Sequence, residues 1–294
     1  MILHFYSSVP LTMEINNNFY DILNTKCLEI ESFNNLFVKV FFYNQNFQNY
    51  VFCLKNRNNT LISNNNFVRI FKIKENEFFA LITPVVKDNS ILHSSKDLTI
   101  KNGTSVYYNK EIIYSENFCA INYTTFSFCG LPFFVLNGEE ENLLLIINKE
   151  NILLKTKFSK IEYDENSFTV LTEMNDSFNH ALVKQFEVLN DGLSLTNEYS
   201  VYMSAPPSIF NKNLVVHNFL ECGKALNLNL AKSFLGGSLK NNFTIENFKS
   251  FFGNFNLFYV YNHTQTSSNC ICVYENHFKN FHFILENDKI INIT

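Results

Sequence analysis

The stretch LVVHNFLECGKALNLNLAKSFLGG, residues 214–237, is where apolar residues recur at helical spacing rather than at the two-residue spacing of strands. One helical stripe carries apolar side chains at i, i+4, i+7 and i+11: Val215, Phe219, Cys222 and Leu226. The Gly236–Gly237 pair is expected to end a second, short helix. The chain is therefore predicted to change from strands to helices at this point.

A third helix is predicted in FTIENFKSFFGNF, residues 243–255, because Thr244 can cap it and Gly253 can end it. Four strand-like pieces follow: NLFYVYN (256–262), NCICVYE (269–275), KNFHFIL (279–285) and KIINI (289–293). Three helices followed by an antiparallel sheet predict a small α+β domain, residues 213–294, whose helices cover one face of the sheet.

The order VVHNFLECGKALNLNLAKSFL, then FTIENFKSFFGNF, then a curved sheet resembles the nuclear transport factor 2-like (cystatin-like cone) fold, in the small bacterial versions that are attached to other domains. The resemblance covers residues 213–294. It implies a cone that holds a substrate, a ligand or nothing, so the fold alone does not imply an activity.

Upstream of residue 204 the chain alternates short aromatic or β-branched runs with polar turns, as in LFVKVFFY (36–43) and FVRIFKI (67–73). This pattern predicts a β subdomain over 1–93 and a β-meander or sandwich domain over 94–205. The double proline in SAPPSIFNKN predicts a linker at 206–212. The expected fold is thus mainly β, an antiparallel sandwich or barrel-like region followed by the cone-like domain.

The composition excludes several classes of protein. Hydrophobic residues make up 46% of the chain, with 33 Phe, which is far too apolar for intrinsic disorder. Arg57 and Arg69 are the two arginines and the net charge is −4, so we expect no nucleic-acid partner. No apolar run approaches the roughly 20 residues needed to cross a membrane. The Asn, Ile, Phe and Lys usage is typical of an AT-rich bacterial genome.

Seven cysteines, an odd number spread over a long chain, predict reduced thiols rather than a disulfide framework. We therefore expect a cytoplasmic protein, or a secreted one if an export signal precedes residue 1.

The densest group of possible metal ligands lies near the carboxyl end and includes Cys270, Cys272 and His277. Thiolate and imidazole groups suit zinc, but Cys270 and Cys272 alternate with Ile271 on a predicted strand and so share one face. We interpret the two thiols as small core residues. No metal and no other cofactor is expected.

Three residues are weak candidates for catalysis. His282 lies opposite Phe281 and Phe283 on its predicted strand, and at the mouth of a cone it would act as an acid or a base. His217 and Glu221 are i, i+4 partners on the exposed side of the first helix, where a surface ion pair is the simpler interpretation.

Two hypotheses about function follow. The first is a non-enzymatic interaction or scaffold protein that docks a protein partner, or itself, through the cone-like domain. The second is a small-molecule binding protein or hydrolase that uses a pocket near His282. A pocket lined by several polar groups favours the second hypothesis, and a cone packed solid with Phe favours the first.

Overall fold

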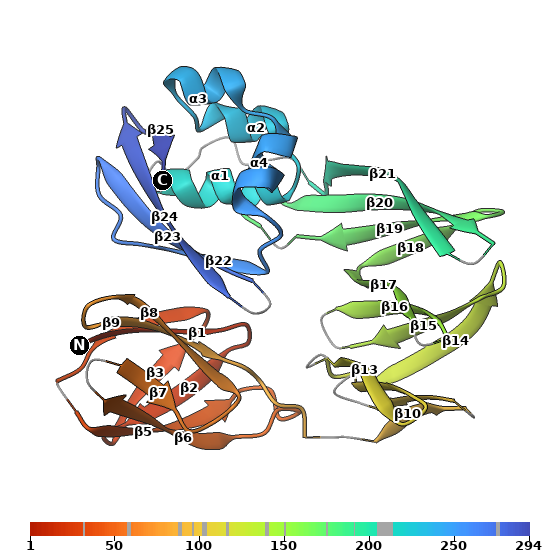
Figure 1. Cartoon of the computed structure of the whole chain (residues 1–294), viewed down its shortest axis with the longest axis horizontal. Helices are drawn as coiled ribbons and strands as arrows, with labels where there is room; N and C mark the ends of the chain where they lie inside the picture. Colours follow the sequence, from red (N-terminus) through yellow and green to blue (C-terminus); the bar gives the residue numbers. More distant parts are fainter. Residues whose placement is uncertain are drawn as a thin grey trace. The chain divides into compact units, whose positions relative to one another are not determined.

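The computed structural model describes residues 1–294 except 32, 58–59, 88–89, 96, 102–104, 116–117, 139–140, 150, 175, 191, 205–213 and 275–276. The chain divides into two compact units, Met1–Lys155 and Thr156–Thr294 (Figure 1). The division falls neither at the predicted 93/94 boundary nor at the predicted linker, and residues 206–212 lie outside the described residues. Among the described residues, no helix has both the length and the apolar character to span a membrane.

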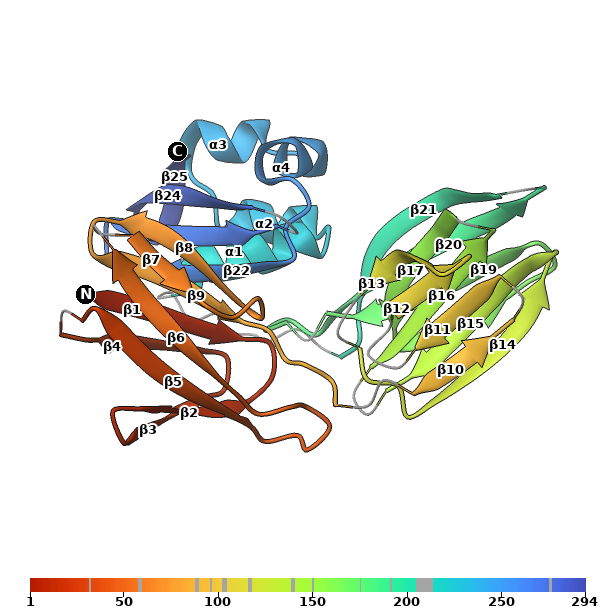
Figure 2. The ribbon, with the colours of Figure 1, turned by 60° about the horizontal axis from the view of Figure 1, so that its bottom comes forward.

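The first unit begins with two sheets that share one core (Figure 2). One sheet has the order β4 (Thr25–Glu29), β1 (Ile2–Ser7), β9 (Glu77–Ile82) and β8 (Val68–Lys74). The other has the order β3 (Asn18–Ile22), β2 (Leu11–Ile15), β5 (Asn35–Phe42), β6 (Tyr50–Arg57) and β7 (Thr60–Ser63). In β5, buried and exposed residues alternate strictly, as a strand with one solvated face requires.

Two further sheets are built from strands that pair in chain order. One contains β10 (Ile91–Ser94), β11 (Leu98–Lys101), β12 (Ser105–Tyr108) and β13 (Glu111–Ser115). The other contains β14 (Asn122–Phe128), β15 (Leu131–Asn137), β16 (Asn142–Asn148) and β17 (Asn151–Phe158). Buried residues of both sheets, such as Val106 and Leu145, form a second core. The boundary between the two units falls within β17.

The second unit opens with a four-stranded antiparallel sheet, again in chain order. Its strands are β18 (Lys160–Tyr163), β19 (Ser167–Glu173), β20 (His180–Leu189) and β21 (Gly192–Tyr202). β21 stands at one edge of this sheet. A register shift between Gln185 and Phe186 marks a bulge in the β20–β21 pairing.

Four helices and a second sheet complete this unit. The helices are α1 (Val215–Lys224), α2 (Leu228–Ser233), α3 (Gly237–Asn242) and α4 (Ile245–Phe252). The sheet has the order β22 (Leu257–Tyr261), β23 (Ser267–Val273), β24 (Phe278–Glu286) and β25 (Lys289–Ile293). Residues of the helices and of β23–β25 share one core, so the helices cover a face of this sheet.

The prediction of three helices is wrong by one. The Gly236–Gly237 pair was expected to end a helix, but Gly237 adopts a φ of +55° and is itself the first residue of α3. Because glycine tolerates positive φ, the pair turns the chain directly from α2 into the next helix. Leu226 also departs from the predicted stripe, since α1 ends at Lys224 and Leu226 has a φ of +61°.

The core beneath the helices is mainly aromatic. Phe219 is fully buried, and its ring centroid lies 5.5 Å from that of Phe243, 5.7 Å from that of Phe248 and 6.0 Å from that of Phe252. The predicted cap of α4 is confirmed, because Thr244 Oγ1 accepts a hydrogen bond from Asn247 N at 3.1 Å. Phenylalanine rings therefore occupy much of the space between the helices and the sheet.

Candidate functional site

His282 lies on the exposed face of β24. Its Nδ1 is 2.8 Å from Asn269 Oδ1 on the neighbouring strand, while Phe281 and Phe283 on either side point into the core. The ring lines none of the three cavities described below. His282 therefore belongs to a solvated sheet surface.

His217 and Glu221 do contact each other, with His217 Nε2 2.9 Å from Glu221 Oε1, but the Glu221 side chain is only 12% exposed, so the predicted position on an exposed helix face is wrong for Glu221. Glu221 Oε2 also accepts a hydrogen bond from Ser177 N at 3.2 Å, and the His217 ring packs 5.0 Å from that of Phe258. The nearest thiol along the helix, Cys222, is fully buried, and burial raises its pKa far above the ordinary range. The Glu221 carboxylate therefore connects α1 to the segment before β20 through its hydrogen bond with Ser177 N.

Cys270 and Cys272 are fully buried in the aromatic core beneath the helices, on one face of β23 as predicted. Burial raises the pKa of the Cys270 thiol well above its usual value. His277 is exposed, and its ring stacks on Tyr274 with centroids 4.4 Å apart. Within the described ranges, no three His, Cys, Asp or Glu side chains gather as metal ligands.

A small apolar cavity of about 220 Å³ lies between α3, α4 and Phe219. Its lining is aromatic and aliphatic apart from Asn242 and Asn247. Pockets for small organic ligands usually enclose roughly 300–1,000 Å³, so this cavity is below that range.

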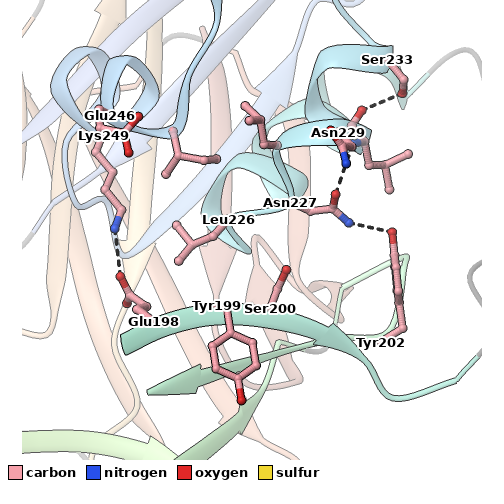
Figure 3. A pocket seen from close by; sticks show the side chains of 13 residues that line it. Glu198, Tyr199, Ser200, Tyr202, Leu226, Asn227, Asn229, Ser233, Glu246 and Lys249 are labelled. Carbon is pink, nitrogen blue, oxygen red and sulfur yellow. Dashed lines mark hydrogen bonds and ion pairs between the residues drawn. The ribbon is translucent and has the colours of Figure 1, made fainter. Parts of the chain in front are cut away.

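A larger groove, of about 870 Å³, runs between β21 and the helices α2 and α4 (Figure 3). The groove is lined by one strand segment, the α1–α2 turn and two helix faces: Glu198, Tyr199, Ser200, Tyr202, Leu226, Asn227, Leu228, Asn229, Leu230, Ser233, Ile245, Glu246 and Lys249. We call it the β21 groove. It combines leucine and isoleucine side chains with polar groups, as binding sites usually do.

β21, four of whose residues line this groove, has an open backbone edge. Met203 N donates to Asn179 O at 2.8 Å, one residue beyond the His180–Tyr202 end of the β20–β21 ladder, so hydrogen-bonded pairs of the ladder fall at Val201 and Tyr199. Such pairs alternate along an antiparallel ladder, so the N–H and C=O groups of Glu198, Ser200 and Tyr202 point away from β20. Within the described residues, no strand pairs with this edge of β21.

A second observation supports this register. The residue opposite Tyr202 is His180, whose carbonyl accepts from Met174 N at 2.9 Å and whose N–H donates to Asp176 Oδ1 at 2.9 Å. Both backbone groups of His180 are therefore directed away from β21. The three outward-facing residues of β21 all line the groove.

A partly buried hydrogen-bond network connects α2 to the end of β21. His180 Nδ1 lies 2.6 Å from Asp176 Oδ2, and Asn227 Nδ2 lies 2.9 Å from His180 Nε2 and 2.6 Å from the Tyr202 hydroxyl. The side-chain oxygen Oδ1 of Asn227 caps α2 by accepting a hydrogen bond from Leu230 N at 3.1 Å. Since the Asn227 side chain contacts His180, Tyr202 and the first turn of α2, it ties the strand to the helix (Figure 3).

The charge of Asp176 helps to orient the His180 ring in this network. Burial acts to raise the pKa of Asp176, but hydrogen bonds from the His180 side chain and backbone outweigh it, and the pKa is lowered. Asp176 is thus an ionised acceptor that orients the imidazole.

An ion-pair bridge crosses the groove at its other end. Glu198 on β21 lies 2.9 Å from Lys249 Nζ on α4 and 3.2 Å from Lys184 Nζ on β20. Burial acts to raise the pKa of Glu198, but the two lysines outweigh it and lower the pKa. The groove is therefore bounded by the Asn227 network at one end and by this bridge at the other (Figure 3).

The comparisons with known proteins add no relative: no protein-family model and no curated protein matches the chain. The groove was not among the sites predicted from sequence. Its key contacts join residues 47 and 51 positions apart, His180 with Asn227 and Lys249 with Glu198, and sequence spacing carries no signal of such pairs.

Proposed function

We propose that this protein is a non-enzymatic interaction module that binds an extended peptide segment of a protein partner. The segment adds as a further strand to the free edge of β21, and its side chains enter the β21 groove. The observation that carries the proposal is the row of backbone groups that point away from β20 at Glu198, Ser200 and Tyr202, three residues that also line that groove.

Strand addition is a common way of recognising peptides, because main-chain hydrogen bonds supply affinity and alternate side-chain pockets supply specificity. The segment Glu198–Tyr202 has five residues, which span roughly 16 Å at about 3.3 Å per residue. Leu226, Leu228 and Ile245 offer an apolar contact to the side chains of the added strand. A strand edge left open in this way is a ready template for pairing with another chain.

We also propose that residues 213–294 are a nuclear transport factor 2-like cone that serves as the docking module. The helical phasing of α1 and α4 and their packing on one face of β22–β25 support this assignment. A core filled with phenylalanine favours docking over an enclosed ligand site. The alternative of a small-molecule site near His282 has less support, since that ring lines none of the three cavities.

The test begins with selection of linear peptides from a random display library on the immobilised full chain. Ser200→Pro removes one outward N–H without removing a ladder hydrogen bond to β20, and proline is accepted on the solvent side of an edge strand. Loss of that donor leaves a buried peptide carbonyl unsatisfied, which costs about 1–3 kcal/mol, or about 5- to 150-fold in affinity.

Ser200→Ala is the matched control, because it keeps the N–H group and should bind within about twofold of the wild type. Failure to select any peptide contradicts the proposal, as does a Ser200→Pro protein that is folded and binds normally. Should Ser200→Pro unfold, N-methylation of each peptide residue in turn decides the question, because strand pairing predicts losses at every second residue.

A further inference from the structure

A second cavity, of about 540 Å³, adjoins the β21 groove on the other side of the Glu198–Lys249 bridge. Glu198, Leu226 and Lys249 line both cavities. The second cavity is lined by parts of β17, β19, β20 and β21 and by the ends of α1 and α4, and it includes four lysines: Lys157, Lys184, Lys224 and Lys249. We call it the lysine cleft.

The charge of the lysine cleft is strongly unbalanced. Against the four lysines stands one carboxylate, Glu198, in a chain that carries more acidic than basic residues, 27 against 23. Lys184 and Lys249 share that single carboxylate. Among the residues that line the cleft, lysines therefore outnumber carboxylates four to one.

Lys224 is held by an uncharged acceptor rather than by a carboxylate. Its Nζ donates to the backbone carbonyl of Asn256 at 2.8 Å and lies 5.7 Å from the centre of the Phe255 ring. Among the described residues, no carboxylate forms an ion pair with it. Burial lowers the pKa of Lys224, so an anion placed beside it would offset part of the cost of keeping the ammonium charged.

The groove and the cleft follow one another along β21. Leu195 lines the cleft, Glu198 lines both cavities, and Tyr202 lines the far end of the groove. A peptide that pairs with the edge of β21 therefore passes beside the lysine cleft within a few residues of Ser200. Its side chains alternate between the two faces of the sheet, so one of them can enter the cleft.

We propose that the partner segment carries an aspartate or glutamate whose carboxylate enters the lysine cleft and pairs with Lys224. This inference rests on the proposed strand addition and names the chemistry of the partner. Complementarity of charge favours an acidic side chain over a neutral or basic one, and it also fixes the register of the added strand, since a shift by one residue would turn the acid to the other face.

The test uses the peptides selected on the full chain. We expect an acidic residue at one fixed position, and we expect that its replacement by the matching amide weakens binding about tenfold or more. Lys224→Met keeps an unbranched side chain and removes the charge, so it should weaken binding of the acidic peptide similarly and leave binding of the amide peptide almost unaffected. Lys240→Met, on the exposed side of α3, is the matched control and should bind both peptides as the wild type does.

Different results separate this inference from the proposed function. Peptides that bind, lose affinity with Ser200→Pro and yet tolerate the amide replacement would overturn the acidic recognition and leave strand addition intact. Failure to select any peptide would overturn both. Because the amide replacement is made in the peptide, its result does not depend on the folding of any protein variant.

Discussion

Gly223→Ala tests how closely α1 packs against α4. A Cβ atom added at Gly223 would lie 2.2 Å from Phe248 Cε2 and 2.4 Å from Cζ. Carbon atoms pack at about 3.5 Å, so the buried ring would have to retreat by roughly 1.3 Å. Overpacking typically costs about 1–3 kcal/mol, and alanine recovers at most about 1 kcal/mol of helix propensity. We expect a net loss of about 1–2 kcal/mol, whereas the same change on an open helix surface is stabilising.

The assay is thiol labelling of Cys270 and Cys272 across a urea series, read by mass spectrometry. Both thiols are fully buried in the core that contains Phe248, so their labelling reports the opening of this core rather than of the whole chain. Gly192→Ala is the control, since no atom lies within 4 Å of its added Cβ, and it should change stability by less than about 0.5 kcal/mol. In a Phe248→Ala background the Gly223→Ala penalty should disappear. A neutral or stabilising Gly223→Ala in the wild type would refute the close approach of α1 and α4.

Two further predictions concern the same unit. Phe219→Ala should lower the free energy of unfolding measured by thiol labelling by about 3–5 kcal/mol, because the side chain is fully buried among four aromatic rings. A loss below about 1 kcal/mol would show that the aromatic core is not packed as described. Asn227→Ala should destabilise the protein by more than the usual loss of about 0.5–2 kcal/mol for a helix cap, since it also removes the contacts to His180 and Tyr202. Asn229→Ala, on the exposed side of α2, is the control and should have little effect. Equal effects of the two changes would contradict the role given to Asn227.

Much of the second unit could be predicted because its signals are local. The spacing of Val215, Phe219 and Cys222 set the buried face of α1, and all three are in the core. Thr244, placed before the apolar stripe of α4, caps that helix as predicted. The four strands after Gly253 also follow their apolar runs. In each case the deciding residues lie within about two helical turns or one strand of each other.

The features that were missed depend on backbone conformation or on distant residues. Both Gly237 and Leu226 adopt positive φ, and the spacing of side chains does not predict either backbone conformation. Glycine both ends and begins helices, so the Gly236–Gly237 pair alone could not separate the two outcomes. The β21 groove depends on which edge of a sheet remains unpaired, and strand order is not encoded in the pattern of a single strand.

The most direct test of strand addition at β21 is residue-resolved amide hydrogen exchange by NMR, without and with a selected peptide. In the free protein, the N–H groups of Tyr199 and Val201 point toward β20 and should exchange slowly, while those of Ser200 and Tyr202 point away from β20 and should exchange quickly. Peptide binding should protect Ser200 and Tyr202 and leave Tyr199 and Val201 protected as before. Uniform exchange along β21 in the free protein, or tight peptide binding that leaves Ser200 and Tyr202 unprotected, would contradict the proposed function.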